Sequence, residues 1–245
     1  MIKNKKEKYR ISLKEYLPTR FEEIIIACHG FGGDKESSAI ELLAKDANEK
    51  NIGVIAFDFP AHGESEVEGD LFTLDNCISD LETVEEYVRE NYKNVKKIDI
   101  FATSYGAYIT LLKIIRNGDN YNKIILRAPA IEMGNIFKDY LLKEDINKFL
   151  ERGFAILGFE RNIKISKEFY LSLEKNKIIE LYNKKKEMLI IQGNEDNVAP
   201  LKDTIEFVNA TNNITLKILQ GADHRMKKEG ELETVVEWTL KYINE

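Results

Sequence analysis

Cysteine and histidine are scarce in this chain of 245 residues, which has two cysteines and three histidines. Cys28 and Cys77 belong to no C-x-x-C pair, and the histidines are far apart with no H-E-x-x-H motif. This composition disfavours a disulfide scaffold and a zinc–thiolate site, and it provides no local nucleus for a metal site. We therefore expect no cofactor and no metal, and we interpret both cysteines as structural thiols in a reducing cytoplasm.

Long apolar runs and an excess of positive charge are also missing. The longest apolar stretch, Ile24 to Cys28, is far shorter than the roughly 18 residues that span a bilayer, and residues 1–14 are lysine-rich without an apolar block. Lysine and arginine number 36 against 42 acidic residues, so no broad basic surface is expected. These features predict a cytoplasmic protein that binds neither nucleic acid nor membrane, and they leave its oligomeric state open.

Short apolar runs alternate with longer segments of helical period. This alternation is typical of an α/β fold, a mostly parallel sheet flanked by helices. An edge strand is predicted where Tyr9, Ile11 and Leu13 alternate with polar residues, and helical faces recur over residues 74–88 and 232–243. The runs predicted as buried strands are Glu23 to Cys28, Gly53 to Asp58, Lys97 to Ala102, Lys123 to Ala128, Met188 to Gln192 and Thr215 to Leu219.

The interval between Ala130 and Met188 is far longer than a usual connection in an α/β fold. We interpret residues 131–186 as a cap insertion, and residues 1–130 and 187–245 as the core that it interrupts. The insertion is predicted to contain a hairpin that turns near Gly158 and a helix capped by Ser166. Most of its aromatic residues are predicted to form its own small core, and a few to line a pocket: Phe137, Tyr140, Phe149, Phe154, Phe159, Phe169 and Tyr170.

Residues 98–108 carry the pattern that is most informative about chemistry, an apolar strand that runs through Ser104 into a helix. This is the layout of a nucleophile elbow. Strand and helix approach so closely at such a turn that the residues two before and two after the serine must be small, as Ala102 and Gly106 are. The serine adopts a strained backbone conformation that exposes its hydroxyl. Ser104 is therefore the candidate nucleophile.

With this elbow the chain resembles the α/β-hydrolases over nearly its whole length, and within them the small capped serine esterases that include the cinnamoyl and feruloyl esterases. It departs from the usual G-x-S-x-G in having Ala102 at the first glycine position. Tyr105, which follows the serine, resembles the elbow of the prolyl-oligopeptidase-like hydrolases. Esterase and peptidase chemistry therefore both stay open at this point.

A serine hydroxyl needs a neighbouring base, and the base needs an acid to orient it; this fold presents them in the chain order serine, acid, histidine. Asp196 follows the strand that ends at Gln192, and His224 follows the strand that ends at Leu219. Both loops open on the same edge of the sheet as Ser104, where ligands of parallel sheets bind. We therefore predict Ser104, Asp196 and His224 as the catalytic triad.

Other residues compete for the acid and base roles. Glu132, beyond the strand that ends at residue 128, and Glu195 are alternative acids, because some hydrolases take their acid from the earlier strand end. His29 and His62 are alternative bases, but both precede Ser104 in the chain, which contradicts the order of the fold.

A glycine-rich turn at residues 29–33 resembles the H-G-x-G segment of the same family. By this resemblance, the backbone N–H groups of Phe31 and Tyr105 form an oxyanion hole, which stabilises the charge that develops on the carbonyl oxygen. His29 is interpreted as a hydrogen-bonded structural histidine that supports the loop. Residues 58–65 resemble a family segment that shapes the site, and we assign no chemistry to them.

The same turn also imitates a dinucleotide-binding unit, with Gly30, Gly32 and an acidic residue, Asp58, at the end of the next strand. The match is incomplete because Lys35 occupies the position of the third glycine. The sequence favours instead a serine carboxylesterase that cleaves small-molecule esters, including aryl or cinnamoyl esters, through an acyl-enzyme. A serine peptidase or amidase and a catalytically silent hydrolase-fold binding protein are the alternatives.

Overall fold

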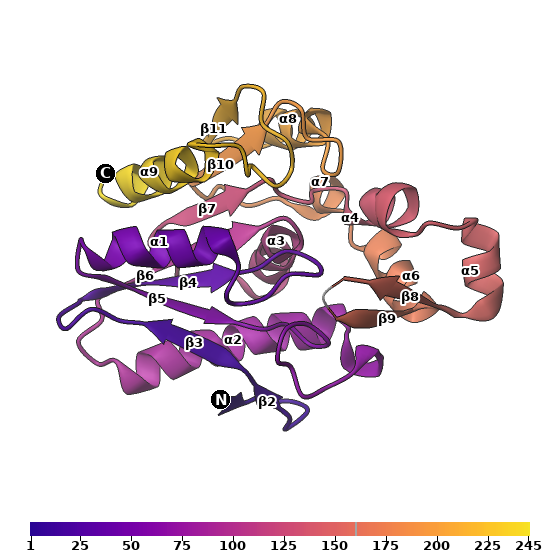
Figure 1. The fold of residues 1–245 in the computed structure, drawn as a ribbon, viewed down its shortest axis with the longest axis horizontal. Helices are drawn as coiled ribbons and strands as arrows, with labels where there is room; N and C mark the ends of the chain where they lie inside the picture. Colours follow the sequence, from indigo (N-terminus) through magenta and orange to yellow (C-terminus); the bar gives the residue numbers. More distant parts are fainter. Residues whose placement is uncertain (160) are drawn as a thin grey trace.

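The computed structural model describes residues 1–159 and 161–245 (Figure 1). Its centre is a seven-stranded sheet in the order β11-β10-β7-β6-β4-β5-β3, within these residues. All neighbouring strands are parallel except β3, which runs antiparallel to β5 at one edge. The strands are β3 (Leu13–Tyr16), β4 (Glu23–Cys28), β5 (Ile52–Phe57), β6 (Lys97–Thr103), β7 (Ile124–Arg127), β10 (Met188–Gly193) and β11 (Ile214–Leu219).

Helices cover both faces of this sheet, as Figure 1 shows. Alternate residues of β4 enter two separate cores, Ile24 and Ile26 on one face and Ile25 and Ala27 on the other. Strands that are buried on both sides read as continuous apolar runs, which explains why they were predictable. The helices on one face are α1 (Ser38–Asn48) and α9 (Glu231–Ile243); those on the other are α2 (Leu74–Asn91), α3 (Tyr105–Asn117) and α8 (Leu201–Ala210). The predicted fold class is confirmed.

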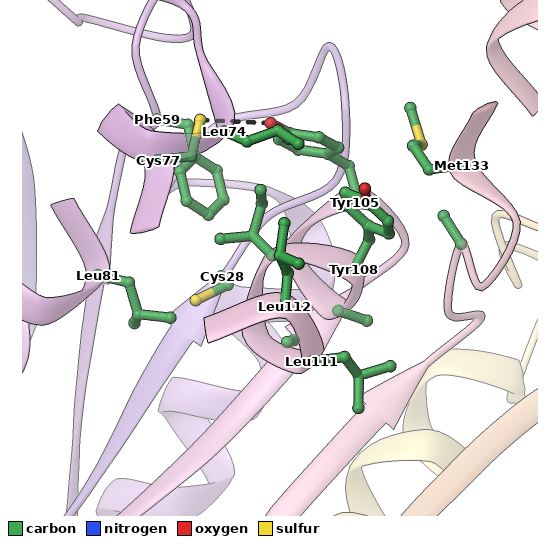
Figure 2. Packing of buried hydrophobic residues seen from close by; sticks show 14 of the residues in the cluster. Cys28, Phe59, Leu74, Cys77, Leu81, Tyr105, Tyr108, Leu111, Leu112 and Met133 are labelled. Carbon is green, nitrogen blue, oxygen red and sulfur yellow. Dashed lines mark hydrogen bonds between the residues drawn. The ribbon is translucent and has the colours of Figure 1, made fainter. Parts of the chain in front are cut away.

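Both cysteines lie in the core next to α3: Cys77 is on α2, and Cys28 is the last residue of β4 (Figure 2). Cys28 and Cys77 are buried free thiols, and the hydroxyl of Tyr105 donates a hydrogen bond to Cys77 Sγ at 3.3 Å. Tyr105 is fully buried, so this contact helps to fix the first turn of α3. None of the helices in the described part of the chain is both long enough and apolar enough to cross a membrane.

The edge strand predicted through Tyr9, Ile11 and Leu13 is wrong in its extent. The strand is interrupted at Ser12, whose carbonyl accepts a hydrogen bond from the backbone N–H of Asp58 at 2.9 Å. Before this break, β2 (Arg10–Ile11) pairs antiparallel with β1 (Ile2–Lys3) in a separate small sheet, and only β3 joins the central sheet. An alternating pattern alone cannot distinguish one strand from two consecutive short ones.

A buried carboxyl group on α2 anchors this N-terminal hairpin. Asp80 Oδ1 accepts hydrogen bonds from Asn4 Nδ2 at 2.6 Å and from the hydroxyl of Tyr9 at 2.8 Å, whereas Oδ2 has no partner within the described residues. Burial disfavours the charged form and raises the pKa of Asp80 to about 7. The carboxyl is therefore neutral below this pH in the folded protein.

We expect Asp80→Asn to flatten the pH dependence of stability. Because the pKa is raised on folding, the contribution of Asp80 to stability is fully present below about pH 4, its ordinary range, and is lost as the pH rises through about 7. Asparagine keeps the Oδ1 acceptor and cannot ionise. Urea unfolding at pH 5 and pH 8.5 should show a loss of stability that is smaller by about 2–3 kcal/mol in the variant, because about two pH units separate pH 5 from the raised pKa. An equal loss in both proteins would exclude this role.

The segment between β7 and β10 lies beyond the carboxyl ends of the central strands, on the right of Figure 1. Ser166 accepts a hydrogen bond from the N–H of Phe169 and caps α6, as predicted, and β8 and β9 pair antiparallel as a hairpin. The elements of this segment are α4 (Met133–Ile136), η2 (Phe137–Leu141), α5 (Ile146–Arg152), β8 (Phe154–Gly158), β9 (Asn162–Ser166), α6 (Lys167–Lys175) and α7 (Ile178–Leu181).

The aromatic residues of this segment divide into two groups. Those that are buried in the main core cluster are Phe137, Phe149, Phe169 and Tyr170; those that are exposed are Tyr140, Phe154 and Phe159. Phe137, Phe149 and Tyr170 pack on one another, with ring centroids 5.3–5.8 Å apart, as the expected small core of the segment. Phe169 stacks instead on Phe72 with ring centroids 4.5 Å apart, and the whole group belongs to the main core cluster, so this core is not separate from that of the sheet.

Candidate active site

The turn from β6 into α3 forces Ser104 into a strained conformation, with φ 50° and ψ −111°. Gly106 makes this turn feasible, because a Cβ there would lie 2.6 Å from the carbonyl oxygen of His29 and 2.8 Å from that of Cys28. Strand β4 therefore passes too close to α3 for any side chain at residue 106. Strain of this kind persists only where the surrounding structure imposes it.

Three side chains from separate loops form a hydrogen-bonded chain at this turn. His224 Nε2 lies 3.0 Å from Ser104 Oγ, and His224 Nδ1 lies 2.8 Å from Asp196 Oδ2. The side chain of Asp196 is fully buried, and that of His224 is 17% exposed. The structure thus brings together the three residues that the sequence predicts as a triad, in a geometry that lets a base take the serine proton.

The carboxylate of Asp196 is held by other hydrogen bonds besides the one to His224. Oδ1 accepts from the backbone N–H of Val198 at 2.9 Å and of Ala199 at 2.8 Å, and Oδ2 accepts from Gln192 Nε2 at 2.7 Å. These donors fix both oxygens, so Oδ2 faces the imidazole in one orientation. An acid held in this way orients the ring and stabilises its protonated form.

The alternative acids do not reach the imidazole. Glu132 precedes α4, where burial raises the pKa of its carboxyl, and it makes no side-chain hydrogen bond to His224. Glu195 points to the surface, where its carboxylate lies 3.7 Å from Lys228 Nζ. Glu195 and Asp196 share the loop after β10, so the direction of the side chain decides between them: Asp196 is buried against His224, whereas Glu195 is exposed.

The alternative bases have structural contacts instead. His29 Nδ1 lies 2.8 Å from the carbonyl of Gly30, and its Nε2 accepts a hydrogen bond from the N–H of Phe59 at 3.1 Å. His62 lies with Nδ1 2.9 Å from the carbonyl of Pro60, and burial lowers its pKa to about 3. His29 therefore supports its loop, as predicted, and both rings are buried with contacts to backbone groups, whereas Ser104 Oγ meets the ring of His224.

The glycine-rich turn lies directly against the elbow. A Cβ at Gly30 would be 3.3 Å from Ser104 Cβ, and Gly32 adopts φ 74°, which favours glycine. Within residues 1–159 and 161–245, neither the N–H of Phe31 nor that of Tyr105 donates a hydrogen bond. Both predicted oxyanion-hole donors are thus free to bind a carbonyl oxygen next to Ser104.

The dinucleotide-binding alternative does not fit these surroundings. Asp58, which would have to bind a ribose, lies 3.0 Å from the buried Lys35 Nζ and also accepts from the backbone N–H of Lys35 and of Glu64. Its oxygens are fully engaged. The turn borders the elbow of Ser104 rather than a phosphate site.

A cavity of about 1370 Å³ opens above Ser104 and His224. The glycine-rich turn forms one wall of the cavity. The other wall consists of residues 140–144, 152 and 154–159. The exposed aromatic side chains of the segment between β7 and β10, Tyr140, Phe154 and Phe159, all line it. Aromatic walls around a few polar groups are typical of small-molecule sites.

Hydrogen bonds, an ion pair and a close backbone contact hold the β8–β9 hairpin against the core beside this cavity. The guanidinium of Arg161 donates to the carbonyls of Ser65 and Val67 at 2.6 and 3.2 Å, and Lys164 Nζ lies 2.9 Å from Asp70. A Cβ at Gly69 would lie 2.0 Å from the carbonyl oxygen of Lys164, so the two backbones touch. These contacts hold Phe159 over the glycine-rich turn, where its ring packs 5.4 Å from that of Phe31.

Arg127, the last residue of β7, links the elbow of Ser104 to the loop of His224. Its carbonyl accepts the N–H of Ser104 at 3.0 Å, and its guanidinium donates to the carbonyl of Arg225, the neighbour of His224. Burial lowers the pKa of Arg127 to about 10, so the group is still cationic at neutral pH. In the sequence, only its position at the end of an apolar strand sets Arg127 apart. That pattern does not predict its contact with Arg225.

We expect Arg127→Met to lower kcat by about 10- to 100-fold, because the loop that carries His224 loses an anchor and small misplacements of a catalytic group are costly. The carbonyl contact to Ser104 survives, and loss of a buried charge without a salt bridge should change stability little. Arg127→Lys, which keeps the charge and one donor, should retain more activity. Kinetics on p-nitrophenyl butanoate with thermal melts would test this; an unchanged kcat for Arg127→Met would refute it.

The fold and this arrangement of serine, histidine and aspartate define an α/β-hydrolase. The chain belongs to the family described as serine aminopeptidase, S33, which matches residues 19–187. No curated protein matches its sequence.

Solved structures of similar fold cover nearly the whole chain. Est1E from Butyrivibrio proteoclasticus, solved with ferulic acid bound, is 20% identical, covers 100% of both chains and has a TM-score of 0.83. Mouse alpha/beta hydrolase domain-containing protein 10 is 15% identical over 98% of this chain and 96% of its own, with a TM-score of 0.80. An esterase from Exiguobacterium antarcticum is 16% identical over 99% and 98%, with a TM-score of 0.70. At these identities the likeness confirms the predicted α/β-hydrolase fold.

Proposed function

We propose that this protein is a serine carboxylesterase that cleaves small-molecule esters through an acyl-enzyme. The observation that carries the proposal is the hydrogen-bonded chain from Ser104 through His224 to Asp196 at the floor of an aromatic-walled cavity. The esterases of similar fold support it. The segment 131–186 then acts as the cap that shapes access to the cavity and excludes water.

In this mechanism His224 Nε2 takes the proton of Ser104 as the hydroxyl oxygen attacks the ester carbonyl. Asp196 holds the imidazole with its Nδ1–H toward the carboxylate and stabilises the imidazolium that forms. The N–H groups of Phe31 and Tyr105 bind the oxyanion of the tetrahedral intermediate. His224 then gives its proton to the leaving oxygen, the acyl–oxygen bond breaks, and water activated by the same imidazole releases the acid.

A serine peptidase is the second candidate, because the family is described as serine aminopeptidase and because Tyr105 follows the nucleophile. An aminopeptidase must bind a substrate ammonium group, which calls for unpaired carboxylates. Among the residues that the structure describes, the acids that line the cavity are Asp34, Glu36 and Glu144; the latter two lie within salt-bridge distance of lysine or arginine, which leaves one unpaired carboxylate, that of Asp34. This balance of charge favours ester over peptide substrates.

Purified protein should hydrolyse short-chain and aryl-acid p-nitrophenyl esters with kcat/KM more than about a hundredfold above that for aminoacyl p-nitroanilides. Amide cleavage requires protonation of the leaving nitrogen by His224, which depends on closer positioning of the scissile bond than an activated ester needs. Adding nicotinamide cofactors or chelators should change neither rate. Anilides cleaved as well as the best ester would indicate a peptidase, and turnover of neither substrate would indicate a silent binding protein.

A further inference from the structure

Among the residues that the structure describes, the charges that line the cavity do not balance. Of the acids, Glu36 pairs with Lys14 and lies 3.8 Å from Lys35, and Glu144 pairs with Arg152. These carboxylates are therefore already neutralised by neighbouring cations.

The cations on the other lining positions have no such partners. Within residues 1–159 and 161–245, no carboxylate lies within 4.0 Å of the charged groups of Lys143, Arg225 or Lys227, all of which are exposed and line the cavity. Asp34 is the one lining acid in the described residues without a salt bridge. The described residues of the cavity lining thus carry excess positive charge, although the chain as a whole has a net charge of −6.

The position of Arg225 and Lys227 places them near the alcohol part of a bound ester. Arg225 and Lys227 lie on the loop of His224, whose Nε2 delivers the proton to the leaving oxygen in the proposed mechanism. The alcohol part of an ester, which receives this proton, therefore lies next to the loop that carries Arg225 and Lys227. The N-terminus of α1 adds a partial charge of the same sign, because Ser38 and Ala39 also line the cavity.

The β8–β9 hairpin contributes apolar side chains to the cavity. Phe159 packs on Phe31 at the glycine-rich turn, and Ile156 is 61% exposed on the same hairpin, where it lines the cavity. Side chains of this kind suit an acyl chain or aryl acid rather than a charged group. The hairpin and the loop of His224 therefore differ in the chemistry that they can bind.

We propose that the natural substrates are esters whose leaving alcohol or phenol carries a carboxylate, bound by Arg225 and Lys227 with support from Lys143, and whose acyl part is apolar. This rests on the proposed esterase function and narrows its substrate class. The reaction is ordinary hydrolysis: water supplies the hydroxyl of the released acid, and the leaving oxygen takes the proton from His224.

The test compares esters that differ only in charge on the leaving group. We expect kcat/KM for 4-carboxyphenyl butanoate to exceed that for 4-carbamoylphenyl butanoate by about tenfold at low ionic strength, and the ratio to fall as salt is added. The carbamoyl group withdraws electrons more strongly than the carboxylate, so leaving-group reactivity alone favours the neutral ester. Monophenyl succinate, with its carboxylate on the acyl side, should gain nothing over phenyl butanoate. A ratio near one for the first pair, or a preference only for the second, would overturn the proposal.

A double substitution tests the residues. In Arg225→Gln/Lys227→Gln the ratio of kcat/KM for the carboxylate ester to that for the neutral ester should fall to about one or below, whatever happens to the rate on the neutral ester. Lys45→Gln/Lys50→Gln removes two exposed lysines at the other end of α1 and should leave the ratio unchanged. If the first double variant keeps the full preference, Arg225 and Lys227 do not bind the carboxylate.

Binding without turnover separates this proposal from the esterase proposal. Calorimetric titration of Ser104→Ala should show 4-hydroxybenzoate binding about tenfold more tightly than 4-hydroxybenzamide at low salt. Tighter binding of the anion, even in the absence of any ester turnover by the wild-type protein, would support the anion site while contradicting the esterase. Equal binding of the two phenols would contradict the anion site, whether or not neutral esters are hydrolysed.

Discussion

Replacing Ser104 by alanine should lower kcat by about a million-fold while leaving the fold intact. The hydroxyl is the only group at the elbow that is both within 3.0 Å of His224 Nε2 and next to the free N–H groups of Phe31 and Tyr105. Without it no acyl-enzyme forms, and the residual rate comes from the oxyanion hole and substrate binding. Alanine tolerates the strained turn about as well as serine, so stability should change little.

A fluorophosphonate probe measured by intact-protein mass spectrometry checks this assignment directly. Wild-type protein should gain one label and Ser104→Ala none, with the same melting temperature. Ser38→Ala is a matched control, because Ser38 also lines the cavity but lies on α1. Equal labelling of Ser104→Ala and the wild-type protein would assign the nucleophile to another residue.

The buried strands and the elbow were predictable because local rules determine them. Each parallel strand is apolar on both faces, and the elbow requires small residues on either side of Ser104, so both leave a pattern in consecutive residues. Asp196 and His224 were identified by their order and by the strands before them. Parallel strands must end at one edge of the sheet, which brings residues 120 positions apart into contact.

The remaining features depend on neighbours that no local pattern specifies. Arg127 and Arg225 are 98 positions apart, and their contact depends on how the β7 and β11 loops meet. Similarly, Phe169 and Phe159 have the same residue type and lie in the same segment, yet one is buried against Phe72 and the other faces the cavity. Composition revealed that the segment is aromatic, but only the packing of the hairpin decides which ring lines the site.

Asp196→Asn should lower kcat by about four orders of magnitude, and Glu132→Gln by less than about tenfold. In the variant, the amide oxygen would accept from the N–H groups of Val198 and Ala199, as Oδ1 does, which turns the amide NH2 toward His224. That donor would make Nδ1 an acceptor, so Nε2 would carry the hydrogen and be unable to take the proton of Ser104.

The same substitution also places the new NH2 against Gln192 Nε2, a donor that now lies 2.7 Å from Asp196 Oδ2, so a modest loss of stability is expected alongside the kinetic effect. Steady-state kinetics on a p-nitrophenyl ester, with circular dichroism to show that both variants are folded, would separate these two consequences. A larger loss for Glu132→Gln than for Asp196→Asn would transfer the acid to the end of β7. It would require His224 to leave the hydrogen bond that it makes here, because Glu132 does not reach the imidazole while Nδ1 faces Asp196.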